Sequence, residues 1–304
     1  MQQLKEQKNA VQLIGELKSF NLNWGRKDKN GREYVGGHLV LKTTNKHGVG
    51  EHRVNIFQYK MTKAGNEALF FKALKTMEQK YKTIEKDGEG TIVKIMATLE
   101  ENVYYNKNKD ELVETISMKP YKITSKEEEI KGEQGVVASV GGFLDNIFQD
   151  EEGKVTCRIT TVNFFGNIIP IRCEVKQELA DKFLELFENE STVTSFKLEI
   201  IKAAQLVEKA VSNDEDEFDG FGDCEEIGDE VVTNYINANM IIGGKPGYNP
   251  EFDLDPEAVK AAYRQRELVL NQKLEEERAT KVNDDFDTQE GFGSEDNDDY
   301  DLPF

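Results

Sequence analysis

The sequence predicts a mainly β protein with some helix (α+β), built as two tandem five-stranded barrels, a C-terminal helix and a disordered acidic tail. Three observations support this prediction. Apolar residues recur at every second position in several segments, which is typical of half-buried strands. One segment with a helical period follows the third of these strands. The same order of three strands, a helix and two strands then occurs a second time along the chain.

The first predicted strand, residues 11–24, changes parity within its length. Apolar residues fall at odd positions up to Leu17 and at even positions from Phe20 to Trp24. One extra residue in a strand reverses the faces of all the residues that follow it, so this pattern predicts a β-bulge. A bulged and strongly bent first strand suits a small barrel.

The remaining elements of the first half are two strands, a helix and two strands. Their predicted ranges are 33–44, 53–59, 67–81, 91–105 and 112–123. In the helix, Phe70, Leu74, Met77 and Tyr81 recur at helical spacing and form one apolar stripe. This is the element order of the OB-fold, a five-stranded Greek-key barrel, so we expect an OB-fold over residues 1–130.

The second half repeats this pattern over residues 131–245. The predicted strands are 136–148, 154–163, 167–176, 192–207 and 231–242, with a helix over 177–189. Residues 212–230 hold ten acids and no bases, and they read as an insertion between the last two strands. We therefore expect a second OB-like domain that carries an acidic insertion.

The C-terminal part of the chain divides into a linker with a helix (246–282) and a tail (283–304). Asp255 followed by Pro256 is typical of a helix start, and the helical pattern extends to about Lys281. The tail holds nine acids and no bases, and it is too polar to bury a core. We expect it to be disordered.

Charge is distributed unevenly along the chain, whose net charge is −19. Residues 1–125 hold 22 Lys/Arg against 15 Asp/Glu, and residues 126–304 hold 17 against 43. This asymmetry is consistent with a polyanion-binding domain followed by segments that stay off the polyanion. Apolar runs of about 18 residues, which would span a membrane, and a signal-peptide core are both missing from the sequence, so we expect a cytoplasmic location.

Motifs for catalysis, metals or cofactors are weak, and we expect none of the three. Cys157 and Cys173 lie among apolar residues of predicted strands and read as buried free thiols, while Cys224 lies in the acidic insertion. The cluster of His38, His47 and His52 lacks further ligands at fixed spacing and reads as solvated or phosphate-facing imidazoles. Residues 215–226 match a calcium loop only loosely, because Glu replaces Asp at its first and third positions and its flanks resemble strands.

The OB-fold prediction places a binding surface on strands two and three and on the loops that join strands 1–2 and 4–5. In the first domain these positions carry aromatic and cationic side chains, which stack on bases and track phosphates in single-strand binding. The predicted binding residues are Trp24, Arg26, Lys27, Lys29, Arg32, Tyr34, Lys42, Arg53, Phe57, Tyr59, Tyr104, Tyr105, Lys107 and Lys109.

The second domain is expected to bind nucleic acid weakly, or to serve as a scaffold or dimer surface. Its first loop, residues 149–153, and its insertion are acidic and would repel phosphates. Phe164 and Phe165, with Arg158 and Arg172, form a possible small stacking surface. We favour the interpretation that they are ordinary core and turn residues.

The last seven residues, D-D-Y-D-L-P-F, end an acidic string on bulky apolar side chains. This end resembles the acidic tip D-D-D-I-P-F of bacterial and phage single-stranded DNA-binding proteins. The resemblance implies an OB-fold that binds the strand and a tip that recruits replication, recombination and repair enzymes. The implied partner-binding residues are Asp298, Asp299, Tyr300, Asp301, Leu302, Pro303 and Phe304.

The sequence departs from the bacterial pattern in three ways. Tyr300 interrupts the acidic run, a second barrel is predicted, and a charged helix replaces a glycine-rich linker. These differences favour a phage-type protein, which would act in the cytoplasm of a bacterial host, and they put the tetrameric state of the bacterial family in doubt. A homo-oligomer of another kind stays possible.

The function predicted from the sequence is non-catalytic, sequence-nonspecific binding and protection of single-stranded DNA. Two alternatives stay open. OB-folds also bind RNA, and nothing in the sequence reports a contact with a 2′-hydroxyl group, so the chain could be an RNA-binding regulator. It could also be a protein-interaction hub that binds no nucleic acid.

Overall fold

The computed structural model describes residues 4–208, 231–245 and 253–287, and the chain divides into two compact units. Unit 1 is drawn from Met1–Glu101 and Ile116–Val259, and unit 2 from Asn102–Thr115 and Lys260–Phe304. Unit 1 holds most of the β structure. The predicted division into domains 1–130 and 131–245 stays a prediction, since both sets of five strands contribute to unit 1.

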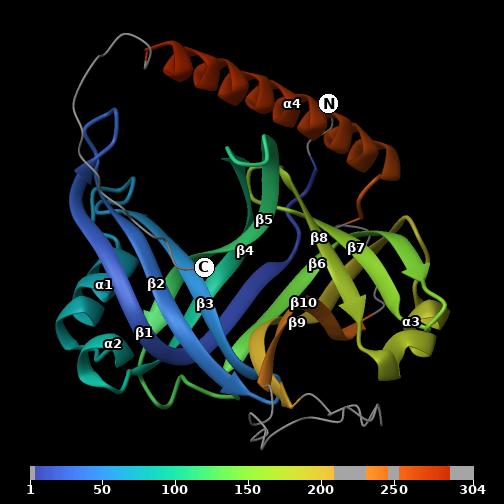
Figure 1. Ribbon diagram of the computed structural model, residues 1–304, viewed down its shortest axis with the longest axis horizontal. Helices are drawn as coiled ribbons and strands as arrows, with labels where there is room; N and C mark the ends of the chain where they lie inside the picture. The colour runs from blue at the N-terminus through green and yellow to red at the C-terminus, as the bar shows by residue number, and fades with distance from the viewer. Residues whose placement is uncertain (1–3, 209–230, 246–252, 288–304) are drawn as a thin grey trace, which may run out of the picture. The chain divides into compact units, whose positions relative to one another are not determined.

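The first half of the chain has the predicted order of strands around a helix (Figure 1). Its elements are β1 (Asn9–Lys27), β2 (Glu33–Asn45), β3 (Gly48–Tyr59), α1 (Leu69–Lys80), α2 (Ile84–Asp87), β4 (Ile92–Asn106) and β5 (Glu111–Thr124). The short helix α2 was not predicted. It ends at Gly88, whose φ of 78° is left-handed and is adopted easily only by glycine.

The second half repeats this order, as predicted. Its elements are β6 (Gly135–Gln149), β7 (Val155–Val162), β8 (Ile168–Val175), the 3₁₀ turn η1 (Gln177–Leu179), α3 (Ala180–Leu186), β9 (Ser191–Glu208) and β10 (Val231–Lys245). The helix α4 (Pro256–Asp287) follows. The mainly β class is therefore confirmed.

Hydrogen bonds join all ten strands into one sheet, in the order β10-β8-β7-β6-β9-β3-β2-β1-β4-β5. β10 also pairs with β9, so the pairings β6–β7–β8–β10–β9–β6 return to the strand at which they start. The two halves are joined by pairings of β6 with β1 and of β9 with β3. Two separate five-stranded barrels accordingly remain a prediction.

The predicted irregularity of the first strand is confirmed. The β1–β2 register shifts between Leu17 and Ser19, where the parity of the apolar residues changes, and again between Asn23 and Arg26. The apolar stripe of α1 is also confirmed, because Phe70, Leu74 and Met77 are buried in a core cluster that extends into both halves of the chain.

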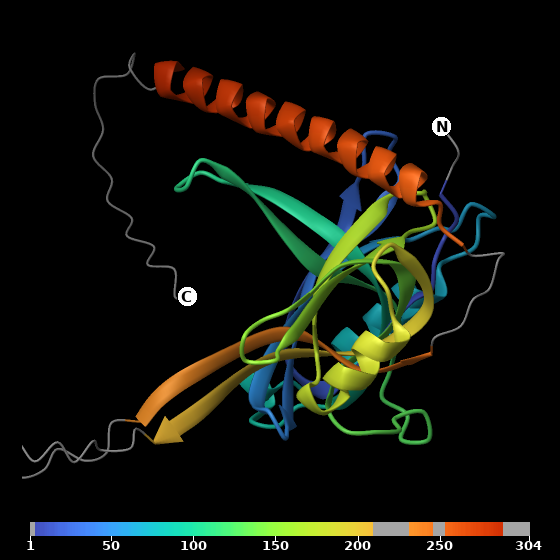
Figure 2. The same cartoon turned by 90° about the vertical axis from the view of Figure 1, so that its right-hand side faces the viewer.

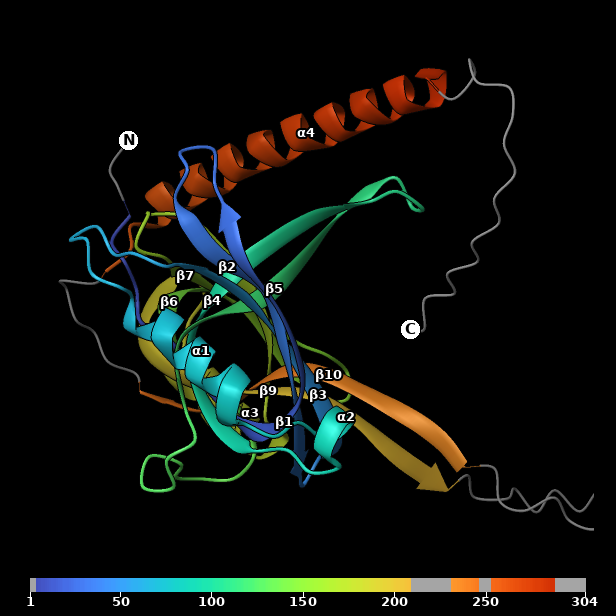
Figure 3. The same cartoon turned by 90° about the vertical axis from the view of Figure 1, so that its left-hand side faces the viewer.

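The strands β9 and β10 form a two-stranded ribbon that projects from the other strands of unit 1 (Figures 2 and 3). The acidic insertion lies between the described ends of these strands, at Glu208 and Val231. The insertion itself, 212–230, lies outside the described residues, as do Cys224 and the calcium-loop resemblance at 215–226.

The start of α4 follows the predicted capping pattern. The Asp255 Oδ1 accepts a hydrogen bond from the Glu257 N–H at 3.1 Å, and Val259 is buried in unit 1. The helix continues to Asp287, past its predicted end near Lys281. The rest of the predicted tail, residues 288–304, lies outside the described residues. Among the described residues, no helix is long and apolar enough to cross a membrane.

Candidate nucleic-acid interface

The solvent face of β2 and β3 carries the aromatic side chains that the sequence placed there. Tyr34 lies opposite Tyr59, and Gly36 lies opposite Phe57. Alternation along β3 buries Ile56 in the core and turns Phe57 outward, so that 51% of Phe57 is exposed. The sheet thus presents rings to solvent on the face that is turned away from its core.

Tyr34, Phe57 and Tyr59 form what we call the β2–β3 aromatic cluster. The ring centroid of Phe57 lies 4.9 Å from that of Tyr34 and 5.1 Å from that of Tyr59. The Tyr34 ring lies over Gly36, 3.5 Å from the point that a Cβ would occupy there, which is an ordinary van der Waals distance. The three rings pack in tilted and edge-to-face contacts, with the Phe57 plane at 39° to that of Tyr34 and at 82° to that of Tyr59.

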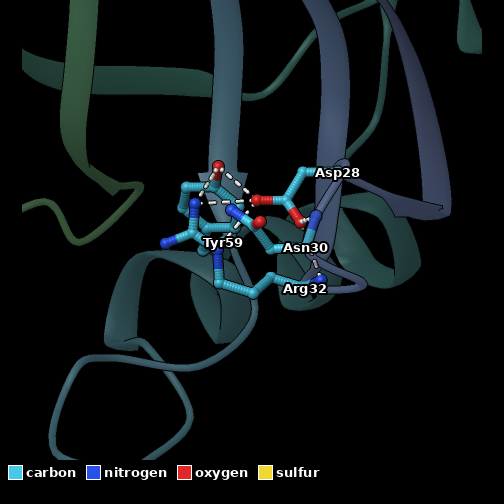
Figure 4. Close-up of polar contacts among 4 residues, drawn as sticks. All are labelled: Asp28, Asn30, Arg32 and Tyr59. Carbon is cyan, nitrogen blue, oxygen red and sulfur yellow. Dashed lines mark hydrogen bonds and ion pairs between the residues drawn. The ribbon is translucent and has the colours of Figure 1, made fainter.

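The loop between β1 and β2 is organised by Asp28, which the sequence analysis had not singled out (Figure 4). Its Oδ1 accepts hydrogen bonds from the N–H groups of Asn30 and Arg32, both at 2.9 Å. Its Oδ2 accepts from the Arg32 Nε at 2.8 Å and from the Tyr59 hydroxyl at 3.0 Å. The sequence signal for this loop was D-K-N-G-R, because Asp and Asn bond to the backbone of tight turns.

The Asp28 network also fixes the orientation of Arg32 against the aromatic cluster. The guanidinium lies 4.2 Å from the centroid of the Tyr59 ring and donates to the Tyr59 hydroxyl at 2.9 Å. Partial burial acts to raise the pKa of the Asp28 carboxyl, but the hydrogen bonds from Arg32, Tyr59 and Asn30 outweigh it and lower this pKa to about 2. Asp28 therefore stays ionised and holds Arg32 in place at neutral pH.

Cations at the edge of the cluster come from the same loop. Arg26, Lys27 and Lys29 are exposed and form no ion pair with the residues that the structure describes. Arg32 differs from them, because its charge is paired with Asp28 at 2.7 Å. The first three can approach a phosphate without first breaking an ion pair.

Further along the same face, Arg53 of β3 contacts His38 of β2. The Arg53 Nη2 lies 3.3 Å from the His38 Nδ1. Burial and the Arg53 charge lower the pKa of His38, so His38 is neutral at pH 7 and serves as the acceptor in this contact. Lys42, which is half-buried, lies opposite Glu51 in the β2–β3 register.

Trp24 does not join the aromatic cluster. Its ring packs edge-on against Phe71 of α1, with centroids 5.0 Å apart, on the core side of the sheet. A shallow pocket of about 480 Å³ lies beside it and is lined partly by Lys75 and Glu78. The parity change in β1 accounts for this placement, because the residues after the bulge reverse their faces.

The other predicted binding residues lie in unit 2, at the tip of the β4–β5 hairpin. Tyr104 is 48% exposed, and Lys107 and Lys109 are exposed. The Tyr105 hydroxyl donates a hydrogen bond to Asp110, which also pairs with Arg278 of α4 at 3.0 Å. The tip residues thus contact α4 within their own unit, an association that the sequence did not predict.

Chemistry of other kinds has little support in the residues that the structure describes. No group of three or more His, Cys, Asp or Glu residues is placed there to hold a metal ion. Cys157 and Cys173 are buried and free, as predicted. Burial raises the pKa of the Cys157 thiol to about 12 and that of Cys173 well above its usual range, so neither is a nucleophile at neutral pH.

Comparison with known proteins gives one family match. The family model YorF matches residues 7–280. No curated protein is similar enough to this chain to count as a match.

Two of the similar solved structures are of the single-stranded DNA-binding protein from Thermus aquaticus. The wild-type structure is 13% identical, with a TM-score of 0.41 over 65% of this chain and 87% of that one. A deletion mutant is 14% identical, with a TM-score of 0.40 over 64% and 86%. Similarity at this level assigns no function to this chain.

Proposed function

We propose that this chain, which belongs to the YorF family, is a sequence-nonspecific single-stranded DNA-binding protein. The observation that carries this proposal is the β2–β3 aromatic cluster, in which Phe57 is half exposed, together with three cations at the adjoining β1–β2 loop that have no ion-pair partner among the described residues. Stacked rings and cations are the two components that non-specific single-strand binding needs.

The cluster would bind bases through their faces. Phe57 is half exposed and Tyr34 is half-buried, while Arg32 covers one face of the Tyr59 ring and Asp28 accepts a hydrogen bond from the Tyr59 hydroxyl. Every base has a π-face, so stacking here does not select sequence. Arg26, Lys27 and Lys29 would pair with the phosphates on either side of a stacked base and would orient the strand along the loop.

Binding to oligo-dT tests the proposal, and Phe57→Ala is its sharpest variant. We expect the wild type to bind, and Phe57→Ala to lose about 1–3 kcal/mol of binding free energy, a roughly 5- to 150-fold rise in Kd. Folding should be almost unchanged, because half of the side chain is already exposed. Fluorescence anisotropy of a labelled oligonucleotide gives the Kd, and thermal unfolding checks the fold.

Phe148→Ala is the matched control. Phe148 is also an exposed phenylalanine of unit 1, at 63%, but it lies beside the acidic turn at 150–152. Its substitution should leave the Kd unchanged. Equal losses in Phe148→Ala and Phe57→Ala would argue against a specific role of the aromatic cluster, and a wild type that binds no oligonucleotide would refute the proposed function.

The salt dependence of the Kd reports how many phosphates are contacted. The slope of log K against log salt should be about −0.7 for each phosphate neutralised. Replacing Arg26, Lys27 and Lys29 with Gln should make the slope shallower. Competition with duplex DNA and with matched RNA distinguishes single-stranded DNA binding from the alternative of RNA binding. A preference for RNA would make the chain an RNA-binding protein with the same stacking surface.

We propose that the chain has no catalytic activity of its own. The two described thiols, Cys157 and Cys173, are buried and have raised pKa values, so neither would act as a nucleophile at neutral pH. Incubation of end-labelled single strands with the protein and Mg²⁺ or Mn²⁺ checks this, because shortened products would reveal a nuclease.

We also propose that residues 298–304 recruit replication, recombination or repair enzymes. This proposal comes from the resemblance of the sequence D-D-Y-D-L-P-F to an acidic recruiting tip, since these residues lie outside those that the structure describes. A peptide of residues 294–304 should bind such an enzyme, and a peptide that lacks Phe304 should not. Equal binding of both peptides would remove the tip from the proposal.

A further inference from the structure

A second pair of exposed rings lies at the tip of the β7–β8 hairpin, in the half of the chain that was expected to bind nucleic acid weakly. Phe164 is 75% exposed and Phe165 is 70% exposed. Their ring centroids lie 5.6 Å apart, with the planes at 80° to each other. The sequence analysis favoured core or turn residues here, and the structure shows that they are turn residues whose side chains leave the core.

The turn that carries the two rings is held by the Asn163 side chain. Its Oδ1 accepts hydrogen bonds from the N–H groups of Phe165 at 2.9 Å and Asn167 at 3.0 Å. The backbone of Asn163 pairs with Asn167 and Gly166 as well, and Gly166 has the left-handed φ of 79° that the turn requires. The rings are therefore presented by an ordered tip.

The strands below the tip fix it to the body of unit 1. Val162 and Thr161 are fully buried on one strand, and Ile168 and Ile169 are buried on the other. The core below is thus filled without Phe164 or Phe165. Exposed rings that the core does not need are typical of a contact surface.

The charges around this hairpin favour an anionic ligand. Residues 156–173 contain two arginines and no carboxylate, although the second half of the chain is strongly acidic. Arg158 is paired with Asp145 at 2.7 Å, but Arg172, opposite it in the register, is exposed. The Gln7 N–H also donates to the Val162 carbonyl at 2.9 Å, which brings the segment containing Lys5, Glu6 and Lys8 next to the turn and adds one net positive charge there.

We propose that the Phe164–Phe165 tip is a second base-stacking contact for single-stranded DNA. This inference rests on the proposed function, because it extends the same strand from the β2–β3 aromatic cluster to a second place in unit 1. The tip supplies two aromatic side chains for bases, and residues 156–173 supply the exposed Arg172 and contain no carboxylate that would repel phosphates. The site is thus a stacking contact with no sequence preference.

The test uses the full-length chain and an oligo-dT series of increasing length. The double variant Phe164→Ala/Phe165→Ala should bind the longer oligonucleotides at least roughly fivefold more weakly for each ring that stacks. It should bind the shortest ones, which the aromatic cluster alone can hold, as well as the wild type does. Phe148→Ala is the control, and its Kd should not change at any length.

A leucine variant separates stacking from general apolar contact. Phe164→Leu/Phe165→Leu keeps apolar surface on the tip but removes the aromatic faces, so it should lose affinity almost as the alanine variant does. Full affinity in the leucine variant would overturn the proposal. Both variants should unfold at the wild-type temperature, because the rings are exposed.

Photo-crosslinking gives a readout that is independent of affinity. Oligonucleotides containing 5-iodouracil should crosslink to Phe164 or Phe165, as identified by mass spectrometry of the digested complex. Crosslinks at Phe57 with none at either tip residue would overturn this inference and leave the proposed function standing.

Three further outcomes would also decide against the tip. Unchanged DNA binding together with a change in sedimentation of the double variant would make the tip a contact between copies of the chain. A wild type that binds no oligonucleotide would remove both this inference and the proposed function. A loss in Phe57→Ala alone, with the double variant unaffected, would remove only this inference.

Discussion

Asp28 shows how a single carboxylate can serve a cationic loop. An acid beside Arg26, Lys27 and Lys29 weakens the local positive potential, yet its four hydrogen bonds fix the turn and place Arg32 against Tyr59. Asp28 thereby ties the β1–β2 loop, which carries the three cations without ion-pair partners among the described residues, to the Tyr59 ring of the aromatic cluster. Asp28 acts on ligands indirectly, by positioning its neighbours.

Replacing Asp28 should reveal its contribution through pH. The pKa of Asp28 falls from the ordinary value of 3.8 to about 2 in the folded protein, so the folded state favours the ionised form. Its stabilising effect is present above about pH 4 and is lost as the pH falls through about 2. Asp28→Asn should therefore lower the free energy of unfolding at neutral pH, and its difference from the wild type should shrink towards zero near pH 2.

Urea unfolding of both proteins between pH 7 and pH 2 measures this difference. Glu85→Gln is the control, because Glu85 is an exposed carboxylate with no ion pair among the described residues. A deficit of Asp28→Asn that is the same at every pH would show that the effect comes from the shape of the side chain and has no link to its ionisation.

At the scale of elements, β2 contains two neighbouring glycines with different roles. Gly37 has a φ of +146°, and a Cβ there would lie 2.0 Å from the Asn21 carbonyl oxygen of β1. Gly36 has no such conformation, and a Cβ there would meet only the Tyr34 ring at 3.5 Å. The first glycine permits the close β1–β2 pairing, whereas a Cβ at the second would make only ordinary van der Waals contact with the Tyr34 ring.

Alanine substitutions at the two positions should therefore differ. Gly37→Ala must shift the β1 backbone and adopt a strained conformation, so we expect a loss of at least about 1–3 kcal/mol in the free energy of unfolding. Gly36→Ala is the matched control and should change it by less than about 1 kcal/mol. Chemical denaturation measures both, and equal stabilities would show that β1 can move without penalty.

Local sequence patterns predicted those elements whose periodicity is continuous. The parity change in β1 and the stripe of Phe70, Leu74 and Met77 in α1 both come from packing against one core, and both were read correctly. The start of β3 at Gly48 was missed, because G-V-G carries no alternation of apolar residues. Such a segment becomes a strand only through its pairing with β2.

The candidate site was predictable in its residue types and less so in its arrangement. Tyr34, Phe57 and Tyr59 could be placed on one face because a strand alternates strictly. Trp24 was harder to place, because it lies inside the second register shift, between Asn23 and Arg26, where the alternation is interrupted. The exposure of Phe164 and Phe165 could also not be predicted from the sequence, because two adjacent phenylalanines in an apolar segment are more often buried in the core than exposed.

The whole molecule combines a cationic first half with an anionic second half, and this has a consequence for binding. Residues 126–304 carry 43 acids, of which ten lie in the insertion at 212–230 and nine in the tail at 283–304. Acidic segments on one chain compete with phosphates for the same cations. The full-length protein would then bind DNA more weakly than the same protein without its acidic segments.

Deleting residues 288–304 should therefore strengthen binding to oligo-dT at low salt. The gain should shrink as salt rises, because the Debye length falls from about 30 Å at 0.01 M to about 10 Å at 0.1 M and the tail is then screened from the cations. The truncated protein should show the steeper slope of log K against log salt, since the wild type exchanges one polyanion for another.

A variant that lacks only Leu302–Phe304 keeps every acidic side chain of the tail and should bind DNA as the wild type does. A Kd that is identical in the full-length and truncated proteins at low salt would show that the tail does not compete with DNA, and that the charge asymmetry serves recruitment or solubility alone.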